Sequence, residues 1–301
     1  MGIKSFFILL KNAALEWVGD NATRLSAALA YYAVFSIAPL LVIIVFIVGL
    51  VYGKEAAEGQ IASQMSGLVG PNAGEAIQSA VIATAASKST GLWAALTSVG
   101  ILLFGASTVF GELKNALNSI WGVEQGPGHA VYTFFRDRLL SFSLVLIVGF
   151  LLLTSLIASS VIAAFNASLS DVVPLSVTLW KAVDMALSIA VTSSLFAMIF
   201  KILPNVILTW RQVFPGAILT ALLFTLGKGL LAWYLGTNSS ASTFGAAGSL
   251  IVVLLWVYYV TGIMFYGAEF TKVYVREYGG GIVPHRHAKL IMTPEEFLKR
   301  Q

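Results

Sequence analysis

Two charged residues stand inside apolar runs, where their side chains could contact a charged or polar solute. Lys228 interrupts the run LLFTLGKGLLAWYLG, and Asp184 is followed at i+4 and i+8 by Ser188 and Thr192. A charge at the centre of a bilayer costs about 2.5 to 3.5 kcal/mol, so such residues usually find a counter-charge or a wet cavity. We expect Lys228 and Asp184 to form an inward pair, either structural or part of a solute pathway. The alternative is that Lys228 reaches outward to the membrane interface.

Two more polar stripes each contain an acid near the expected inner end of a helix. Helical spacing aligns Gly105, Thr108, Glu112 and Asn115 on one face, and Tyr258, Gly262, Tyr266 and Glu269 on another. Arg24 lies at the same expected depth as Glu112 and Glu269, which predicts a cluster of these three charges. In the competing interpretation, Arg24 anchors the chain at the interface and both acids are solvated.

The residue types that enzymes use for catalysis are sparse and dispersed. The chain has no cysteine, and its three histidines, His129, His285 and His287, fall in predicted loops. Metal-dependent hydrolysis needs converging carboxylates or imidazoles, whereas the acids here are scattered along the sequence. We therefore expect no catalytic residue, no metal site, no cofactor and no enzymatic activity.

The composition indicates which elements must position these side chains. Of the 301 residues, 58% are hydrophobic and 11% are charged, against roughly 25% charged residues in soluble domains. Six apolar segments reach the roughly 20 residues that a spanning helix needs. They run from 27 to 52, 92 to 110, 139 to 165, 179 to 203, 213 to 235 and 246 to 273. The predicted fold class is an all-α integral membrane protein with six transmembrane helices and amphipathic interfacial helices.

The segments around these helices define three predicted parts. Residues 1–20 form an N-terminal amphipathic interfacial helix, residues 21–275 form the six-helix membrane domain, and residues 276–301 form a flexible cytoplasmic tail. An amphipathic helical loop at 54–90 lies on the outer side. Lys and Arg concentrate in the segments that share a side with the N-terminus, so both termini are expected in the cytoplasm. The basic pI of about 9.2 follows from this topology and needs no nucleic-acid partner.

Three residues inside the predicted spans are hinge candidates. Proline removes a helical hydrogen bond, and glycine adds backbone freedom. The candidates are Pro39, Gly248 and Gly262.

Four motifs occur in order along the chain. They are RLSAALAYYAVFSIAPLL from residue 24, FGASTVFGELKNALNSIWGV from 104, PNVILTWRQVFPGA from 204 and GSLIVVLLWVYYVTGIMFYGAEF from 248. Through these motifs the sequence resembles the YihY/BrkB family of bacterial inner-membrane proteins from about residue 20 to 275. The resemblance implies six membrane helices and a role in the envelope or in transport. It places family-like residues at Arg24, Pro39, Glu112, Asn115, Asn118, Trp121, Trp210, Gly216, Gly248, Trp256 and Glu269.

Some members of that family carry the label ribonuclease BN, which the residues here do not support. We expect instead a transporter or flippase of the bacterial cytoplasmic membrane, which moves an envelope-related polar, amphiphilic or ionic solute through a polar cavity among the helices. The alternative is a non-transporting scaffold or assembly factor for the cell envelope. The expected partners are membrane lipids, an unidentified small solute or lipid substrate, and a second copy of the chain in a homo-oligomer.

Overall fold

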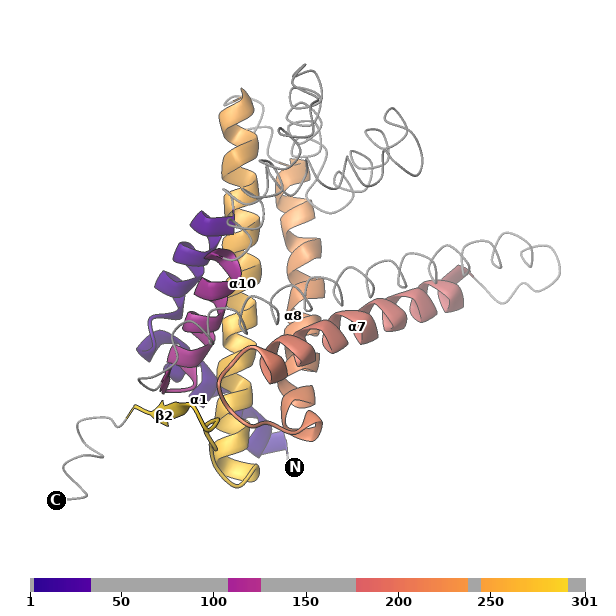
Figure 1. Cartoon of the computed structure of the whole chain (residues 1–301). Coiled ribbons are helices and arrows are strands. Elements are labelled where there is room, and N and C mark those ends of the chain that lie inside the picture. Colours follow the sequence, from indigo (N-terminus) through magenta and orange to yellow (C-terminus); the bar gives the residue numbers. More distant parts are fainter. Residues whose placement is uncertain (1–2, 34–107, 126–176, 238–244, 292–301) are drawn as a thin grey trace, which may run out of the picture. The chain divides into compact units, whose positions relative to one another are not determined.

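The computed structural model describes residues 3–33, 108–125, 177–237 and 245–291 (Figure 1). The named elements in these ranges are helices α1 (Ile3–Gly19), α7 (Val177–Ile202), α8 (Trp210–Thr237) and α10 (Gly245–Tyr278), and strands β1 (Val123–Gln125) and β2 (Ala288–Leu290). Residues 22–33 and 108–120 are also helical. The predicted outer loop at 54–90, the hinge candidate Pro39, the third predicted span and most of the first and second spans lie outside the described residues.

The chain divides into two compact units. Unit 1 comprises Met1–Asp20, Lys114–Thr225 and Met264–Gln301, and unit 2 comprises Asn21–Leu113 and Leu226–Ile263. The division passes through α8 and α10, so each of these helices contributes one part to each unit. The tertiary contacts described below each lie within a single unit.

Helices α8 and α10 cover the fifth and sixth predicted spans, and α7 covers the fourth up to Ile202. Among the described residues, Met185–Ile202 and Trp210–Leu230 are long and apolar enough to cross a membrane, with mean hydropathies of 1.8 and 1.6. Only 28% and 33% of these two windows are buried within the protein, whereas the core helix of a soluble protein would be mostly covered. The 34 residues of α10 extend for about 51 Å at 1.5 Å per residue, which exceeds the roughly 30 Å hydrocarbon core of a bilayer.

Helix α8 presents an apolar face to its surroundings in unit 1. Trp210, Phe214, Ile218 and Leu222 recur at every fourth residue and are 40% to 45% exposed. A helix in lipid keeps such side chains outside because acyl chains are as apolar as leucine. The side of α8 that faces the protein is instead built from small residues.

Small residues let α8 and α10 approach closely within unit 1. Thr271 lies against Gly216, and Thr220 lies against Gly267, so each helix fits a threonine onto a glycine of the other. Each threonine hydroxyl donates a 2.7 Å hydrogen bond to a carbonyl of its own helix, Thr220 to Gly216 and Thr271 to Gly267. The polar atoms are therefore satisfied inside the contact, and the missing glycine side chains permit the close approach.

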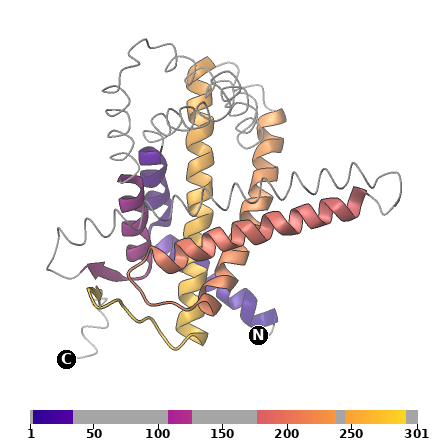
Figure 2. The ribbon, with the colours of Figure 1, turned by 45° about the vertical axis from the view of Figure 1, so that its right-hand side comes forward.

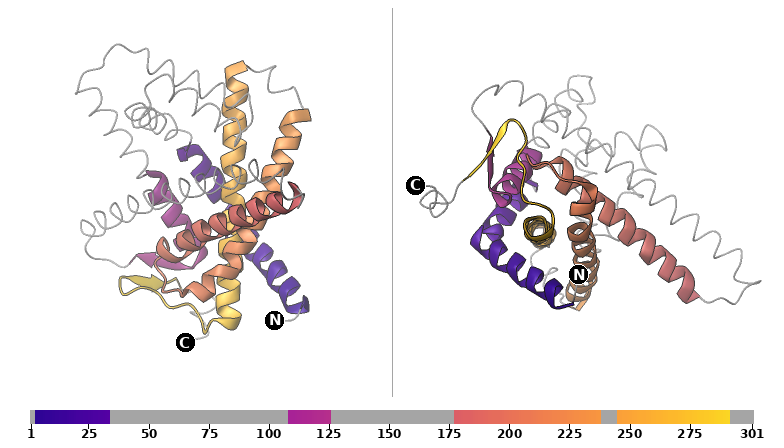
Figure 3. Two further views of the ribbon diagram at one scale, coloured as in Figure 1. Left: turned by 90° about the vertical axis from the view of Figure 1, so that its right-hand side faces the viewer. Right: turned by 90° about the horizontal axis from the view of Figure 1, so that it is seen from below.

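Helix α1 crosses the C-terminal part of α10 instead of running beside it. Phe6 of α1 and Asp20, the residue that follows α1, lie about 21 Å apart along the helix axis at 1.5 Å per residue. Their partners Phe270 and Lys272 nevertheless belong to the same turn of α10. The helices therefore meet at a steep angle, which is visible in the view from below (Figure 3, right). The buried apolar residues at the crossing are Leu9, Ala13, Phe270 and Val273.

Gln212 ties the start of α8 to the end of α10. Its Oε1 accepts a 2.7 Å hydrogen bond from the Thr209 backbone N–H and a 2.9 Å bond from the Thr209 hydroxyl, which together cap the helix. Its Nε2 donates to the Gly279 carbonyl at 2.9 Å. Helix α10 ends there because Gly280 and Gly281 adopt φ values of +81° and +97°, a conformation that favours glycine.

The segment that follows α10 is hydrogen-bonded to two other parts of unit 1. The His285 N–H donates to the Asn205 carbonyl at 2.9 Å, and β2 pairs antiparallel with β1 (Figure 2). The sequence predicted a flexible tail from residue 276, whereas α10 continues to Tyr278 and β2 ends only at Leu290. Pairing between short segments far apart in the chain leaves no local periodicity that could reveal it. Residues 292–301 of the predicted tail lie outside the described residues.

Unit 2 uses the same kind of close helix contact. The Thr261 hydroxyl of α10 lies 3.4 Å from the Ser26 carbonyl oxygen in the helical stretch 22–33. The Tyr259 ring of α10 lies over Gly227 of α8. Small or hydroxylated residues again allow the backbones to approach.

Replacing Gly216 with alanine tests the close contact between α8 and α10. The added Cβ would overlap the Thr271 hydroxyl and lie 2.8 Å from the Gly267 backbone oxygen, which cannot rotate away. Overpacking of this kind costs about 1 to 3 kcal/mol, so the melting temperature in detergent should fall. In the matched control, Gly229→Ala, the new Cβ meets nothing within 4 Å, and loss of a helical glycine should stabilise by up to about 1 kcal/mol. Equal melting temperatures for the two variants would contradict the packing argument.

Candidate functional site

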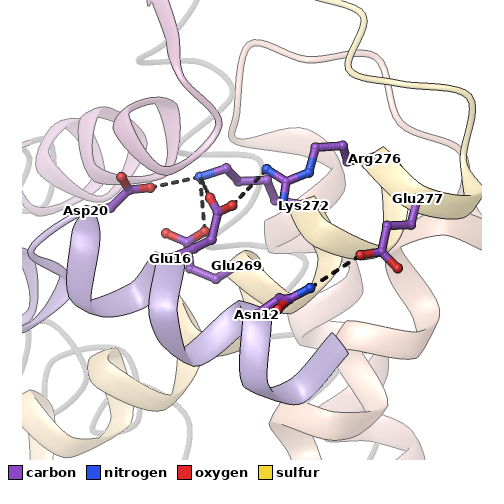
Figure 4. A network of polar contacts seen from close by, with 7 residues as sticks. All are labelled: Asn12, Glu16, Asp20, Glu269, Lys272, Arg276 and Glu277. Carbon is purple, nitrogen blue, oxygen red and sulfur yellow. Dashed lines mark hydrogen bonds and ion pairs between the residues drawn. The ribbon is translucent and has the colours of Figure 1, made fainter. Parts of the chain in front are cut away.

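Five charged side chains of α1, its C-terminal neighbour Asp20 and α10 converge at the helix crossing (Figure 4). The ammonium of Lys272 is the centre of the group. Its Nζ lies 2.7 Å from Glu16 Oε2, 2.8 Å from Asp20 Oδ2 and 3.2 Å from Glu269 Oε2. We call Glu16, Asp20, Glu269, Lys272 and Arg276 the crossing cluster.

Helical spacing places the acids at the end of α1 and the charged residues of α10 on faces that meet at the crossing. Glu16 and Asp20 are four residues apart, so they project from the same side of the α1 end. On α10, Glu269, Lys272 and Arg276 are spaced at i, i+3 and i+7, which also places them on one face. Acids from one segment thus meet bases from the other over the apolar contact of the crossing.

The cluster is exposed at one end and buried at the other. Arg276 donates to Glu16 Oε1 at 2.7 Å, with about half of the arginine side chain exposed. Partial burial raises the pKa of Glu16, but hydrogen bonds from Lys272 and Arg276 outweigh burial and hold that pKa below its ordinary value of 4.5. Glu16 is therefore ionised at neutral pH and contributes a full negative charge.

Glu269 is the buried end of the cluster. Its side chain is 0% exposed, and that of Lys272 is 11% exposed. One oxygen, Oε2, accepts the Lys272 hydrogen bond, while the buried Oε1 has no hydrogen-bond partner among the described residues. A buried polar atom without a partner costs about 1 to 3 kcal/mol, and more when charged. The carboxyl group is therefore held in place at an energetic cost.

Three of the carboxylates are close enough to share a cation. Oxygens of Glu16, Asp20 and Glu269 all lie within 4.8 Å of one another. The Lys272 ammonium contacts each of the three acids, so the protein itself supplies a cation to this group. The expectation of no metal site rests on acids scattered along the sequence, whereas the fold brings these three carboxyl groups together.

Only one member of the crossing cluster was among the predicted site residues. The polar stripe predicts Glu269, whereas Lys272 and Arg276 are not among the predicted site residues. Glu16 and Asp20 were not selected at all. The available signal was the i, i+4 spacing of acids in one segment and the i, i+3, i+7 spacing of charges in another.

The predicted group of Arg24, Glu112 and Glu269 is not tested by these contacts. Arg24 is exposed and Glu112 is half-buried, and both belong to unit 2, whereas Glu269 belongs to unit 1. The remaining inner stripe residues show a range of exposure. Asn115 and Tyr258 are exposed, while the half-buried Tyr266 donates from its hydroxyl to the Leu10 carbonyl at 3.1 Å.

The predicted pair of Asp184 and Lys228 also stays a prediction. The side chain of Asp184 lies outside the described residues, and Lys228 is exposed on the unit 2 part of α8. Ser188 is exposed and Thr192 half-buried on α7. The hinge candidates Gly248 and Gly262 both lie inside the continuous helix α10.

Comparison with known families places residues 13–290 in one family. The family described as "Virulence factor BrkB" matches residues 13–290. The chain belongs to the BrkB family. The match covers α1 from Ala13 onward, all of α7, α8 and α10, and β2, so the crossing cluster lies inside the shared region.

Relatives of this BrkB family chain are named as membrane proteins. A UPF0761 membrane protein of Alcanivorax borkumensis is 28% identical over 99% of this chain and 67% of its own length. Another from Mannheimia succiniciproducens is 27% identical over 84% of this chain and 85% of its own length. A Bacillus subtilis relative, YfkH, is named ribonuclease-like and is 26% identical over 79% of this chain and 84% of its own length.

Family membership and helix composition together show a helical membrane protein. The chain spans about 60% of the length of its Pseudomonas aeruginosa relatives, at 26% identity. No solved structure matches the chain.

Removing the central cation tests how strongly the crossing depends on the cluster. Lys272→Met leaves the buried Glu269 without its charged partner, and breaking a buried pair in this way costs about 3 to 5 kcal/mol. The double variant Lys272→Met, Glu269→Gln should lose less stability than the two single changes combined, because both charges leave together. Thermal or denaturant unfolding in detergent would measure the coupling in a double-mutant cycle.

Arg276→Met is the matched control because its side chain is 49% exposed. An exposed ion pair contributes about 0 to 1 kcal/mol, so this change should be mild. Additive single effects at Lys272 and Glu269, within about 0.5 kcal/mol, would show that the two charges do not act as a buried pair.

Proposed function

We propose that the protein is a transporter or flippase of the bacterial inner membrane, which moves an envelope-related polar, amphiphilic or ionic solute through a polar cavity among its helices. The observation that carries the proposal is Glu269, a fully buried carboxyl at the inner end of the apolar run of α10 in a membrane protein. Ionisable residues in such helices are costly and commonly mark solute pathways. A purely structural pair would be expected to satisfy both carboxylate oxygens.

The unpaired oxygen of Glu269 indicates which chemical groups of a solute could bind here. Oε1 is an acceptor without a donor among the described residues, so a passing hydroxyl, ammonium or hydrated cation would gain a hydrogen bond there. The Lys272 ammonium beside it already contacts three carboxylates, so its three N–H donors are in use and the position does not favour an anionic group. A solute that carries a hydroxyl or a cationic group therefore finds a partner at this position.

The proposed topology has six spans with both termini in the cytoplasm. It is supported by the length of α10, whose last turn carries Arg276, and by the concentration of lysine and arginine on the N-terminal side of the predicted spans. The proposal also holds that the chain is not an enzyme. The name of the Bacillus subtilis relative concerns that protein, and the three carboxylates that converge in the described part of this chain contact the Lys272 ammonium.

Cysteine labelling tests the topology directly, since the chain has no cysteine of its own. Cysteines introduced at Ser63 and Ser239, in the predicted outer loops, should react with an impermeant thiol reagent in intact cells. A cysteine at Glu124, an exposed residue of β1, should react only after the cells are permeabilised. Labelling of the Glu124 site alone in intact cells would reverse the proposed orientation.

A non-transporting scaffold for envelope assembly is the second candidate. The observation that favours it is the close contact of α8 with α10, in which two glycines are covered by threonines of the opposite helix. A contact without room for side-chain movement suits a rigid support. The transport experiment separates the two functions.

Purified protein in proteoliposomes tests the transport proposal. The panel would contain fluorescent short-chain phospholipids, sodium, potassium and phosphate, each followed across the membrane against empty vesicles. At least one should cross faster with the protein, and Glu269→Gln should slow it by at least about tenfold, which corresponds to about 1.4 kcal/mol on the barrier. Arg276→Gln, at the exposed edge of the cluster, is the matched control and should retain most of the rate.

Two results would contradict this account. If no member of the panel crosses faster than in empty vesicles, the scaffold function is favoured. If a solute crosses but Glu269→Gln keeps the full rate and the full melting temperature, the buried carboxyl is not part of the pathway.

A further inference from the structure

Helix α1 has a second face, opposite the one that packs on α10. Its residues recur at helical spacing, and the four apolar ones are more than half exposed, from 54% for Ile8 to 67% for Val18. The two lysines among them are also exposed. We call this the outer face of α1, and its residues are Lys4, Phe7, Ile8, Lys11, Leu15 and Val18.

The outer face carries positive charge only. The acid within α1, Glu16, and the following Asp20 both bind Lys272 on the opposite side. Lys4 and Lys11 are therefore not balanced by acids of their own helix on this face. A partner of the outer face must offer an apolar surface beside negative charge.

The crossing geometry places the outer face at a particular level. Tyr266, which binds the Leu10 carbonyl of α1, lies about 32 Å along α10 from Gly245 at 1.5 Å per residue. That length is about one hydrocarbon core, so the crossing falls at the level where α10 leaves the membrane. Because α1 crosses α10 steeply there, it lies roughly in the membrane plane.

We propose that the outer face of α1 lies in the membrane interface and binds anionic lipids. Phe7, Leu15 and Val18 enter the boundary between headgroups and acyl chains, as the apolar face of an interfacial helix does. The stems of Lys4 and Lys11 run along this apolar surface, and their ammonium groups reach the lipid phosphates. This inference concerns membrane attachment and stands independently of the transport proposal.

Site-directed spin labelling of the full-length protein tests where the outer face lies. Single cysteines at Leu15 and Val18 are free of background because the chain has no other cysteine. In vesicles of phosphatidylcholine and phosphatidylglycerol, both labels should be more accessible to oxygen than to a water-soluble nickel complex. The control label at Val283, an exposed residue between α10 and β2, should show the reverse.

Lipid selectivity tests the role of the lysines. A fluorophore at position 15 should be quenched more by brominated phosphatidylglycerol than by brominated phosphatidylcholine. A basic residue at an anionic surface contributes about 1 kcal/mol, so each change, Lys4→Gln and Lys11→Gln, should lower this preference by up to about fivefold. Lys289→Gln, an exposed lysine of β2, should leave it unchanged.

Three outcomes would overturn the inference. Labels at positions 15 and 18 that are most accessible to the nickel complex would place the outer face in water. Labels shielded from both reagents would indicate a protein partner or a second copy of the chain. If the Lys4→Gln, Lys11→Gln double variant keeps its lipid preference and its melting temperature, the lysines do not bind anionic lipids selectively.

Discussion

The ammonium of Lys272 sits between carboxylates from two segments of the chain, and the place of α1 depends on this interaction. The apolar contact beneath it, of Leu9 and Ala13 with Phe270 and Val273, is non-directional and tolerates small shifts of one helix over the other. The ion pairs do not tolerate such shifts, because Glu16, Asp20 and Glu269 all contact the same Lys272 nitrogen. Desolvation offsets much of the Coulomb attraction in such a buried group, so its main effect is to specify geometry.

Different interactions hold helix α10 on its two sides. On one side charges fix the crossing of α1, and on the other a steric fit of glycines and threonines fixes α8. Lipid provides little hydrophobic drive for helices to associate, so packing and hydrogen bonds must supply the specificity. Gln212 then joins the cap of α8 to the end of α10, which fixes the two helices where they leave the apolar region.

The sequence predicted the elements better than the site. Apolar runs define spans by their length, so the predicted ranges 213–235 and 246–273 fall inside α8 and α10. Helix α10 continues to Tyr278, past the predicted span, because Arg276 and Glu277 extend the helix beyond the apolar run. Glu269 was selected by its stripe, but its partner was sought at equal depth in other spans. The group with Arg24 and Glu112 stays a prediction, whereas the i, i+3 spacing from Glu269 to Lys272 indicates the partner within its own helix.

The unequal numbers of acids and bases at the crossing explain two features, the unpaired oxygen of Glu269 and the positive charge of the outer face of α1. Three carboxylates share two cations, and the deficit falls on the most buried group, where Glu269 Oε1 lacks a donor among the described residues. The same use of Glu16 and Asp20 at the crossing removes negative charge from the rest of α1, so its outer face keeps only Lys4 and Lys11. One set of ion pairs thus leaves an acceptor facing the protein interior and a basic, apolar surface facing outward. A change that released α1 from Lys272 would alter both features together, because the same ion pairs hold the donor of Glu269 and orient the outer face of α1.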